Sequence, residues 1–253
     1  MKITLFQTDI IWGDPDRNIV AADRLFDAAP SSDLYVLPEM WSTGFMTNCH
    51  VKPQDKALEW MKSKAQSHRA AVCGSLAMPL DSGKNANRLF FAKPDGTVDF
   101  YDKRHLFSYG KEDLFFSKGN RRVIVEYGGI RFLLTTCYDL RFPVWARCRK
   151  DYDAMICVAN WPDSRQNVWD TLLRARAIEN QCYVIGCNRT GNDPSCHYEG
   201  HSALIDFYGK AIAESKSDTE HVLTAEIDID QLNHFRKKFP ALEDMDSFTL
   251  DIG

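Results

Sequence analysis

The chain reads Ile130-Arg-Phe-Leu-Leu-Thr-Thr-Cys137-Tyr-Asp-Leu-Arg-Phe-Pro143 at its centre, and this stretch predicts the most about the fold. Its first seven residues form an apolar run typical of a buried strand, and residues 144–150 have the pattern of a helix. A cysteine at a strand-to-helix turn projects its sulfur from the end of a sheet, where backbone N–H groups lower a thiol pKa and hold a developing oxyanion. A structural cysteine would be equally at home there, so Cys137 alone leaves both interpretations open.

Strand and helix patterns alternate on both sides of this stretch. Strands are predicted at 3–8, 34–37, 70–77, 88–92, 97–101, 122–126, 130–136, 154–159, 182–187, 202–206 and 222–227. Helices are predicted at 18–28, 56–68, 144–150 and 166–180. Hairpins and helical crossovers both occur, which predicts layered α and β structure with mixed sheets. Because no linker-like tract interrupts the chain, we expect one domain over residues 1–253.

Two further reactive side chains follow predicted strands. Glu39 comes just after the apolar run 34–37, and Lys103 comes just after the hairpin strand 97–101. The carboxyl ends of strands are where open α/β sheets hold their reactive groups. Taken singly, each residue is more often a solvated surface charge, so neither one by itself indicates a site.

The composition excludes several classes of protein. The chain has 31 basic and 35 acidic side chains and a formal charge of −4, which is not the basic excess of a nucleic-acid-binding protein. No apolar run approaches the roughly 20 residues that cross a bilayer, and the first residues lack the apolar core of a signal peptide. We therefore expect no nucleic-acid partner, no membrane association and a cytoplasmic location.

Cysteine and histidine spacing argues against disulfides and against a metal. Eight cysteines occur, at positions 49, 73, 137, 148, 157, 182, 187 and 196, and none forms a Cys-x-x-Cys pair. In a chain of this size most of them are expected to be small buried hydrophobic residues. His197 and His201 have the spacing of a helical zinc pair, but Pro194 and Gly200 interrupt the helix that this spacing requires. No metal site is predicted.

Taken together, the reactive segments resemble the signatures of the carbon–nitrogen hydrolase, or nitrilase, superfamily. The matching strings are Leu37-Pro-Glu39, Tyr101-Asp-Lys103-Arg-His-Leu106, Thr136-Cys137-Tyr-Asp-Leu-Arg-Phe-Pro143 and Ala159-Asn-Trp-Pro162, followed by residues 169–181, 188–193, 198–202 and 206–209. The resemblance covers nearly the whole chain. It implies a four-layer αββα sandwich, in which two mixed sheets pack face to face within a single domain.

The resemblance also implies a role for each matching residue. Glu39 matches the general base, Lys103 the cation that stabilises the oxyanion, and Cys137 the nucleophile. Glu112 matches a second glutamate that orients the base-side network or the substrate amide, and the backbone N–H of Tyr138 completes the oxyanion hole. Because an amide is a poor electrophile, its cleavage needs both an activated nucleophile and a donor aimed at the carbonyl oxygen. This chemistry requires no metal and no organic cofactor.

Within the superfamily the chain looks most like the ω-amidase branch, on the strings Cys137–Pro143, Ala159–Pro162 and Ala175–Gln181. Enzymes of that branch release ammonia from the terminal amide of α-keto acid monoamides such as 2-oxoglutaramate or 2-oxosuccinamate. The substrate carboxylate suits a guanidinium, so Arg141 is the candidate clamp. The alternative is a structural ion pair between Arg141 and Asp139. The candidate pocket walls are Phe45, Tyr109 and Trp161.

Other functions of the same fold stay open at this point. Hydrolysis of N-carbamoyl amines or nitriles uses the same thioester chemistry, and a catalytically silent member would bind a small ligand or a protein. The intact set Glu39, Lys103, Glu112 and Cys137 argues against a silent member. Members of the superfamily commonly stack their sandwiches into dimers, so the resemblance also implies a homodimer.

Overall fold

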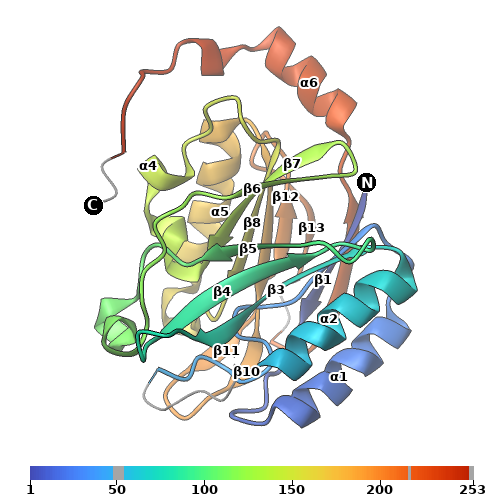
Figure 1. Ribbon diagram of the computed structural model, residues 1–253. Helices are drawn as coiled ribbons and strands as arrows, with labels where there is room; N and C mark the ends of the chain where they lie inside the picture. Colours follow the sequence, from blue (N-terminus) through green and yellow to red (C-terminus); the bar gives the residue numbers. More distant parts are fainter. Residues whose placement is uncertain (48–53, 216–217, 251–253) are drawn as a thin grey trace.

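The computed structural model describes residues 1–47, 54–215 and 218–250 (Figure 1). Within these residues, two six-stranded sheets have the strand orders β14-β1-β2-β3-β4-β5 and β13-β12-β9-β8-β7-β6. The first sheet contains β1 Lys2–Gln7, β2 Leu34–Val36, β3 Ala71–Pro79, β4 Asn85–Ala92, β5 Val98–Asp102 and β14 His221–Glu226. The second contains β6 Ile124–Tyr127, β7 Ile130–Thr136, β8 Ala154–Ala159, β9 Tyr183–Asn188, β12 Ala203–Ile205 and β13 Ala211–Glu214. A separate ribbon pairs β10 Thr190–Asn192 with β11 His197–Glu199.

Both sheets are mixed, as predicted. In the first sheet β1, β2 and β3 pair in parallel, and β14, β4 and β5 run antiparallel to their neighbours. In the second sheet β7, β8 and β9 pair in parallel, and β6, β12 and β13 pair antiparallel. The parallel strands bring several strand ends to the same edge of the molecule, which is where the candidate site lies.

Helices α1 Pro15–Ala28 and α2 Asp55–His68 cover the outer face of the first sheet, and α5 Gln166–Asn180 covers that of the second (Figure 1). The short helices are α3 Glu112–Phe115 and α4 Pro143–Ala146, and α6 Ile229–Lys238 packs Leu232 against the core between the sheets. Short 3₁₀ turns are η1 Ser108–Gly110, η2 Cys137–Arg141, η3 Asp163–Arg165 and η4 Ala241–Glu243. Helix α1 begins earlier than the sequence pattern predicted, because Pro15 fits the first helical position and the Asp14 carboxylate accepts the backbone N–H of Arg17.

The four-layer arrangement follows from side-chain alternation along the buried strands. Leu5 belongs to the core between the two sheets, whereas Phe6 belongs to the core beneath α1 and α2. In the second sheet Leu134 faces the first sheet, and Leu133 packs in the outer core with residues of α5. Successive residues of a strand point to opposite faces, so each central strand contributes to two cores. The αββα sandwich implied by the sequence is confirmed.

The helix predicted at 144–150 is observed only as α4, which ends at Ala146, and the sequence pattern missed several elements. Residues 147–150 are not helical, since Arg147 and Cys148 turn to hydrogen-bond with Glu179 and Asn180 at the end of α5, and Lys150 has a left-handed φ of 61°. The elements that the pattern did not predict are α3, α6, β10, β11 and β13. The last three have only three or four residues each, too few for a period-2 pattern to stand out.

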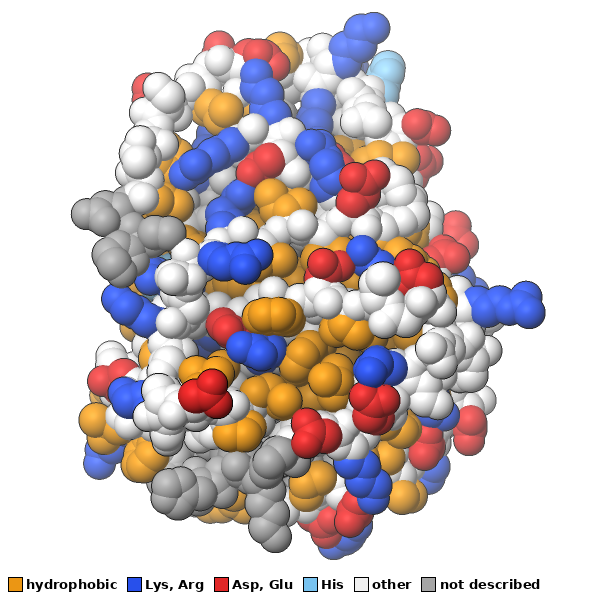
Figure 2. Space-filling model, viewed as in Figure 1, with side chains coloured by type: hydrophobic (Ala, Val, Ile, Leu, Met, Phe, Trp, Pro, Cys, Tyr) orange, Lys and Arg blue, Asp and Glu red, His pale blue; other side chains and the backbone are white. Residues whose placement is uncertain are grey.

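The molecular surface is mixed in charge. Figure 2 shows acidic and basic side chains interspersed over the face that it presents, with apolar side chains between them. None of the described helices is long and apolar enough to cross a membrane.

Candidate active site

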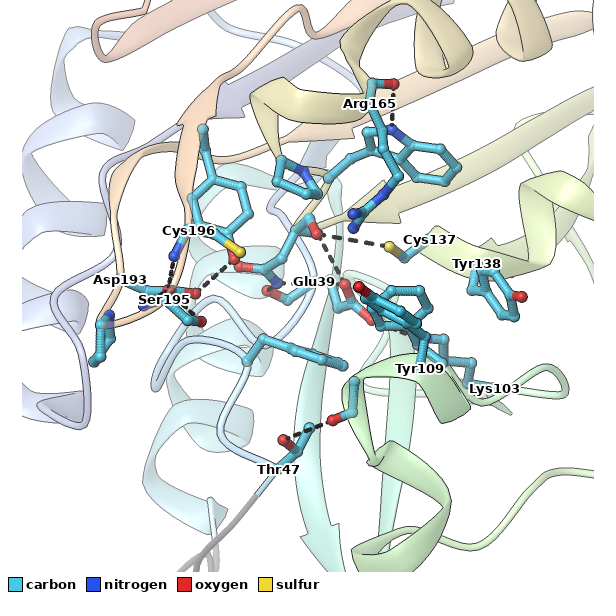
Figure 3. Close-up of a pocket in the computed structure, with 18 of the residues that line it drawn as sticks. Glu39, Thr47, Lys103, Tyr109, Cys137, Tyr138, Arg165, Asp193, Ser195 and Cys196 are labelled. Atoms are coloured by element: carbon cyan, nitrogen blue, oxygen red, sulfur yellow. Dashed lines mark hydrogen bonds and ion pairs between the residues drawn. The ribbon is translucent and has the colours of Figure 1, made fainter.

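The three residues of the predicted triad line a single cavity of about 320 Å³. Each follows a strand: Glu39 comes soon after β2, Lys103 directly after β5, and Cys137 directly after β7. Residues 34–36 are fully buried, so the backbone just before Pro38 has a fixed position. The Glu39 side chain that follows is also buried. Figure 3 shows Glu39, Lys103 and Cys137 pointing toward the same space. The structure therefore brings together side chains that are up to 98 residues apart in the sequence (137 − 39 = 98).

Glu39 is held by donors on both of its oxygens. Its side chain is fully buried. Its Oε1 accepts from Lys103 Nζ at 2.9 Å and from Asn87 Nδ2 at 2.7 Å. Its Oε2 accepts the backbone N–H of Asn160 at 2.8 Å. These bonds fix the orientation of the carboxylate before any ligand enters the cavity.

Lys103 lies between two carboxylates with no exposed side-chain surface. Its Nζ donates to Glu39 Oε1 at 2.9 Å and to Glu112 Oε2 at 3.0 Å. Burial lowers the pKa of Lys103, but the charges of Glu112 and Glu39 outweigh burial and raise that pKa well above its ordinary value. Lys103 is therefore a permanent cation beside Cys137.

Glu112 binds the Lys103 ammonium from outside the cavity. Besides Nζ, it accepts from the backbone N–H of Phe107 at 2.6 Å and from Asn87 at 3.2 Å. Burial raises the pKa of Glu112, and the charge of Lys103 only partly offsets this. Glu112 is not among the residues that line the cavity, and its contacts are with Lys103 and Asn87, the partners of Glu39.

Cys137 begins η2 with a left-handed φ of 46°, a strained conformation at the end of β7. Its thiol lies 3.8 Å from the carbonyl oxygen of Asn160. Burial and the charge of Glu39 raise the pKa of the Cys137 thiol well above its ordinary value, although Lys103 opposes them. Burial and Glu39 therefore outweigh the lowering of the thiol pKa that a strand-end turn and a nearby cation can give.

Asp139 connects the Cys137 turn to the segment that follows Lys103. It is fully buried, and its Oδ2 accepts from Tyr101 Oη at 2.8 Å and from the backbone N–H of Thr136 at 2.9 Å. Its Oδ1 accepts from the backbone N–H of His105 at 3.0 Å and lies 2.8 Å from His105 Nδ1. The Asp139 carboxylate thus fixes the position of the Cys137 turn relative to the segment that follows Lys103.

The predicted binding residues Arg141, Phe45, Tyr109, Trp161 and Tyr138 all line the cavity. Arg141 does not pair with Asp139, whose oxygens are taken by other groups, and its guanidinium instead stacks on the Trp161 ring at 5.2 Å. Tyr109 is 87% exposed, which places it at the rim rather than in the interior.

Sequence reasoning missed several residues of the site. Asn87 and Asn160 hold Glu39, and Arg165 lines the cavity. Asn160 belongs to the matching string 159–162, but the sequence did not indicate that it binds Glu39. Asn87 and Arg165 carry no local signal, because their importance arises from contacts with residues distant in the sequence.

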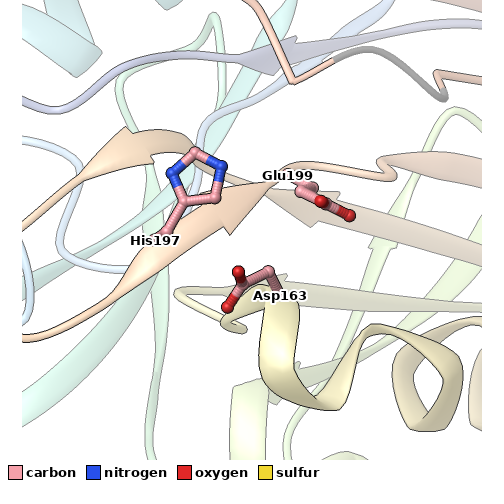
Figure 4. A group of neighbouring side chains, drawn as sticks. All are labelled: Asp163, His197 and Glu199. Carbon is pink, nitrogen blue, oxygen red and sulfur yellow. The ribbon is translucent and has the colours of Figure 1, made fainter.

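A separate surface group contains Asp163, His197 and Glu199, whose side-chain ligand atoms lie within 4.8 Å of one another (Figure 4). The imidazole of His201 lies elsewhere, 3.1 Å from Asp170. The two histidines of the zinc-like spacing therefore do not converge. All seven described cysteines are free thiols, and Cys49 lies outside the described residues.

An αββα sandwich with Glu, Lys and Cys at adjoining strand ends is the architecture expected of a carbon–nitrogen hydrolase. The chain belongs to this family: the family model described as carbon-nitrogen hydrolase matches residues 2–237. The chain is 46% identical to the Omega-amidase YafV of Escherichia coli, with 99% of this chain and 98% of the relative covered. It is 35% identical to the 2-oxoglutaramate amidase of Bacillus subtilis, with 96% of each covered. A CN-hydrolase superfamily protein of Xanthomonas campestris, solved with an arsenic adduct in its active site, superimposes with a TM-score of 0.94 at 40% identity and covers 99% of both chains.

Proposed function

We propose that the protein is an ω-amidase that cleaves the terminal amide of small carboxylate-bearing amides, of the 2-oxoglutaramate or 2-oxosuccinamate type, and releases ammonia. The observation that carries this proposal is the meeting of Glu39, Lys103 and Cys137 in one cavity that also contains Arg141. The names of the two curated relatives, an omega-amidase and a 2-oxoglutaramate amidase, support the choice of substrate.

In the first half of the reaction Cys137 becomes acylated. Glu39 takes the proton of the thiol, and the sulfur attacks the amide carbonyl carbon. The negative charge that develops on the carbonyl oxygen is stabilised by the Lys103 ammonium and the Tyr138 backbone N–H. Glu39 then returns the proton to the amide nitrogen, the C–N bond breaks, and ammonia leaves while the acyl group stays on sulfur as a thioester.

In the second half water replaces the sulfur. Glu39 removes a proton from a water molecule, whose oxygen attacks the thioester carbon, and the same oxyanion donors stabilise the intermediate. The C–S bond breaks, the sulfur takes back the proton, and the carboxylic acid product leaves. Glu112 keeps Lys103 in place, because both oxygens of Glu112 lie within 3.2 Å of Nζ. Each positioned group is expected to contribute about 10²–10⁴ in rate.

A substrate screen tests the function directly. We expect ammonia release to be fastest with 2-oxoglutaramate or 2-oxosuccinamate, and slower with nitriles and N-carbamoyl amines. A preference for bulky N-carbamoyl amines or for nitriles would overturn the ω-amide assignment. Absence of turnover with every class would support a silent, ligand-binding member instead.

Replacing Arg141 by glutamine is expected to raise the KM for 2-oxoglutaramate by roughly 10- to 100-fold, because a charged hydrogen bond to the substrate carboxylate is lost. Steady-state ammonia release measures the effect. Arg149, an exposed arginine stacked on Phe248 away from the cavity, provides the matched control R149Q, which should behave as wild type. An equal loss by R141Q on neutral amides would contradict a role in carboxylate binding.

The proposal extends to the assembly and the compartment. We propose a homodimer whose interface includes a continuous apolar strip formed by Ile178, Tyr208, Phe235 and Phe239, of which Ile178, Tyr208 and Phe239 are 55–63% exposed. Light scattering should give about twice the 28.9 kDa mass of one chain, and Y208D should shift the mass toward one chain. A single-chain mass for the wild type would refute the dimer.

The free thiols and the thiol-based mechanism support a reducing, cytoplasmic location.

A further inference from the structure

A second arginine, Arg165, lies in the same cavity as Cys137 and Arg141. It is the last residue of η3, directly before the 15-residue helix α5, and its backbone is held by Trp161, whose indole N–H donates to the Arg165 carbonyl at 2.9 Å. Figure 3 shows the Arg165 side chain extending from this turn into the pocket toward Cys137. The proposed chemistry of amide cleavage does not use it.

The guanidinium of each arginine lies over an aromatic ring. The Arg165 guanidinium stacks on the Phe107 ring at 5.2 Å, as the Arg141 guanidinium stacks on Trp161 at 5.2 Å. Stacking holds the plane of a guanidinium and leaves its N–H edge free to bind a carboxylate. In the described part of the chain neither guanidinium has a carboxylate partner. By contrast, Arg174 on α5 is paired with Glu214 at 2.7 Å.

The acidic residues of the cavity cannot neutralise these two cations, because their oxygens are already bound. Glu39 is paired with Lys103 at 2.9 Å. Asp193 accepts from Tyr198 Oη at 2.6 Å and from the backbone N–H groups of Ser195 and Cys196 at 2.7 Å each. The amino end of α5 adds a partial positive charge beside Arg165. The cavity therefore has two cationic groups available to an anionic ligand.

We propose that Arg165 is a specificity-determining residue that binds, together with Arg141, the 2-oxo carboxylate end of the substrate. This inference rests on the proposed function. A 2-oxo acid carries three oxygens, two on the carboxylate and one on the adjacent carbonyl, which can lie in one plane. One guanidinium takes both carboxylate oxygens, and the other takes one carboxylate oxygen and the 2-oxo oxygen, each through two parallel N–H bonds. A neutral amide offers neither arginine a charged partner.

The test compares three substrates that share the cleaved amide: 2-oxoglutaramate, glutaramate, which lacks the 2-oxo group, and butyramide, which has no charge. For R165Q we expect kcat/KM to fall about 10- to 100-fold with 2-oxoglutaramate, less with glutaramate, and less than about 2-fold with butyramide. R165K keeps the charge but loses the bidentate geometry, so its loss should be intermediate. R174Q, on the same helix outside the cavity, is the matched control and should equal wild type.

A binding measurement gives a second, independent readout. Titration calorimetry of 2-oxoglutarate into C137A, and into C137A combined with R165Q, should show an affinity about 10- to 100-fold weaker in the double variant. Equal losses of R165Q on all three substrates would overturn the inference and assign Arg165 a structural role. Wild-type turnover of 2-oxoglutaramate by R165Q would overturn it while leaving the proposed function intact. A wild-type enzyme that hydrolyses butyramide but not 2-oxoglutaramate would overturn the proposed function itself.

Discussion

Replacing Cys137 by alanine is expected to abolish ammonia release from 2-oxoglutaramate, with a loss in kcat on the order of 10⁴-fold or more. The loss is large because, in the proposed mechanism, the sulfur at the left-handed turn after β7 forms the covalent intermediate, and alanine has no nucleophilic atom. The variant should fold normally, since a thiol at the cavity surface contributes little to the core and alanine is the smaller residue. Circular dichroism and thermal unfolding check the fold, and ammonia release checks the activity.

Cys196 provides the matched control for this experiment, because it is the other cysteine that lines the cavity. C196A should retain activity within a few-fold of wild type. Acid quenching during turnover, followed by mass spectrometry, should find the substrate acyl group on the peptide that contains residue 137. Unchanged turnover by C137A, or an acyl group on Cys196, would refute the mechanism.

Replacing Lys103 by methionine is expected to reduce both activity and stability. Activity should fall by about 10²–10³ because one of the two oxyanion donors is lost. The free energy of unfolding should fall by about 3–5 kcal/mol, since Glu39 and Glu112 are fully buried and would lose their shared counter-charge. Urea unfolding measures the stability, and a decrease below about 1 kcal/mol would contradict a buried ion-paired triad.

The stability loss of K103M should depend on pH in a defined direction. Burial already raises the pKa of Glu112 in the wild type, and removal of Lys103 takes away the positive charge that lowers it, so the pKa of Glu112 rises further. A carboxyl whose pKa is higher in the folded state contributes its full stability below its unfolded pKa of about 4.3, and loses it as pH rises through the folded pKa. The gap between K103M and wild type should therefore narrow from pH 8 to pH 5.

A double variant distinguishes two causes of the stability loss in K103M: the uncompensated buried charge and the lost packing of the lysine side chain. K103M combined with E112Q removes one of the two unpaired carboxylates, so part of the lost stability should return at pH 7 while activity stays low. If the double variant is no more stable than K103M, loss of the lysine's packing, and not uncompensated charge, determines the effect.

The sequence alone predicted the order of strands and helices and the positions of Glu39, Lys103 and Cys137 at strand ends. These predictions depend on local features: strand-like runs of four to eight residues, turn residues between them, and a reactive side chain just beyond a run. The predicted length of the helix after Pro143 was wrong for the opposite reason. Its pattern was locally plausible, but contacts of residues 147 and 148 with the end of α5 decided the conformation.

Protonation and binding were decided only by the tertiary structure. The pKa of the Cys137 thiol depends on burial and on Glu39, which lies 98 residues away in the sequence (137 − 39 = 98), and both effects oppose the lowering expected from a strand-end turn. Likewise, Arg165 has no motif of its own, and it joins Arg141 in one cavity only because the fold places η3 and the Cys137 turn at the border of the same cavity. A sequence pattern reports which residues begin and end an element, whereas burial and electrostatic fields arise from contacts between elements, so they exist only once the sheets and helices have packed.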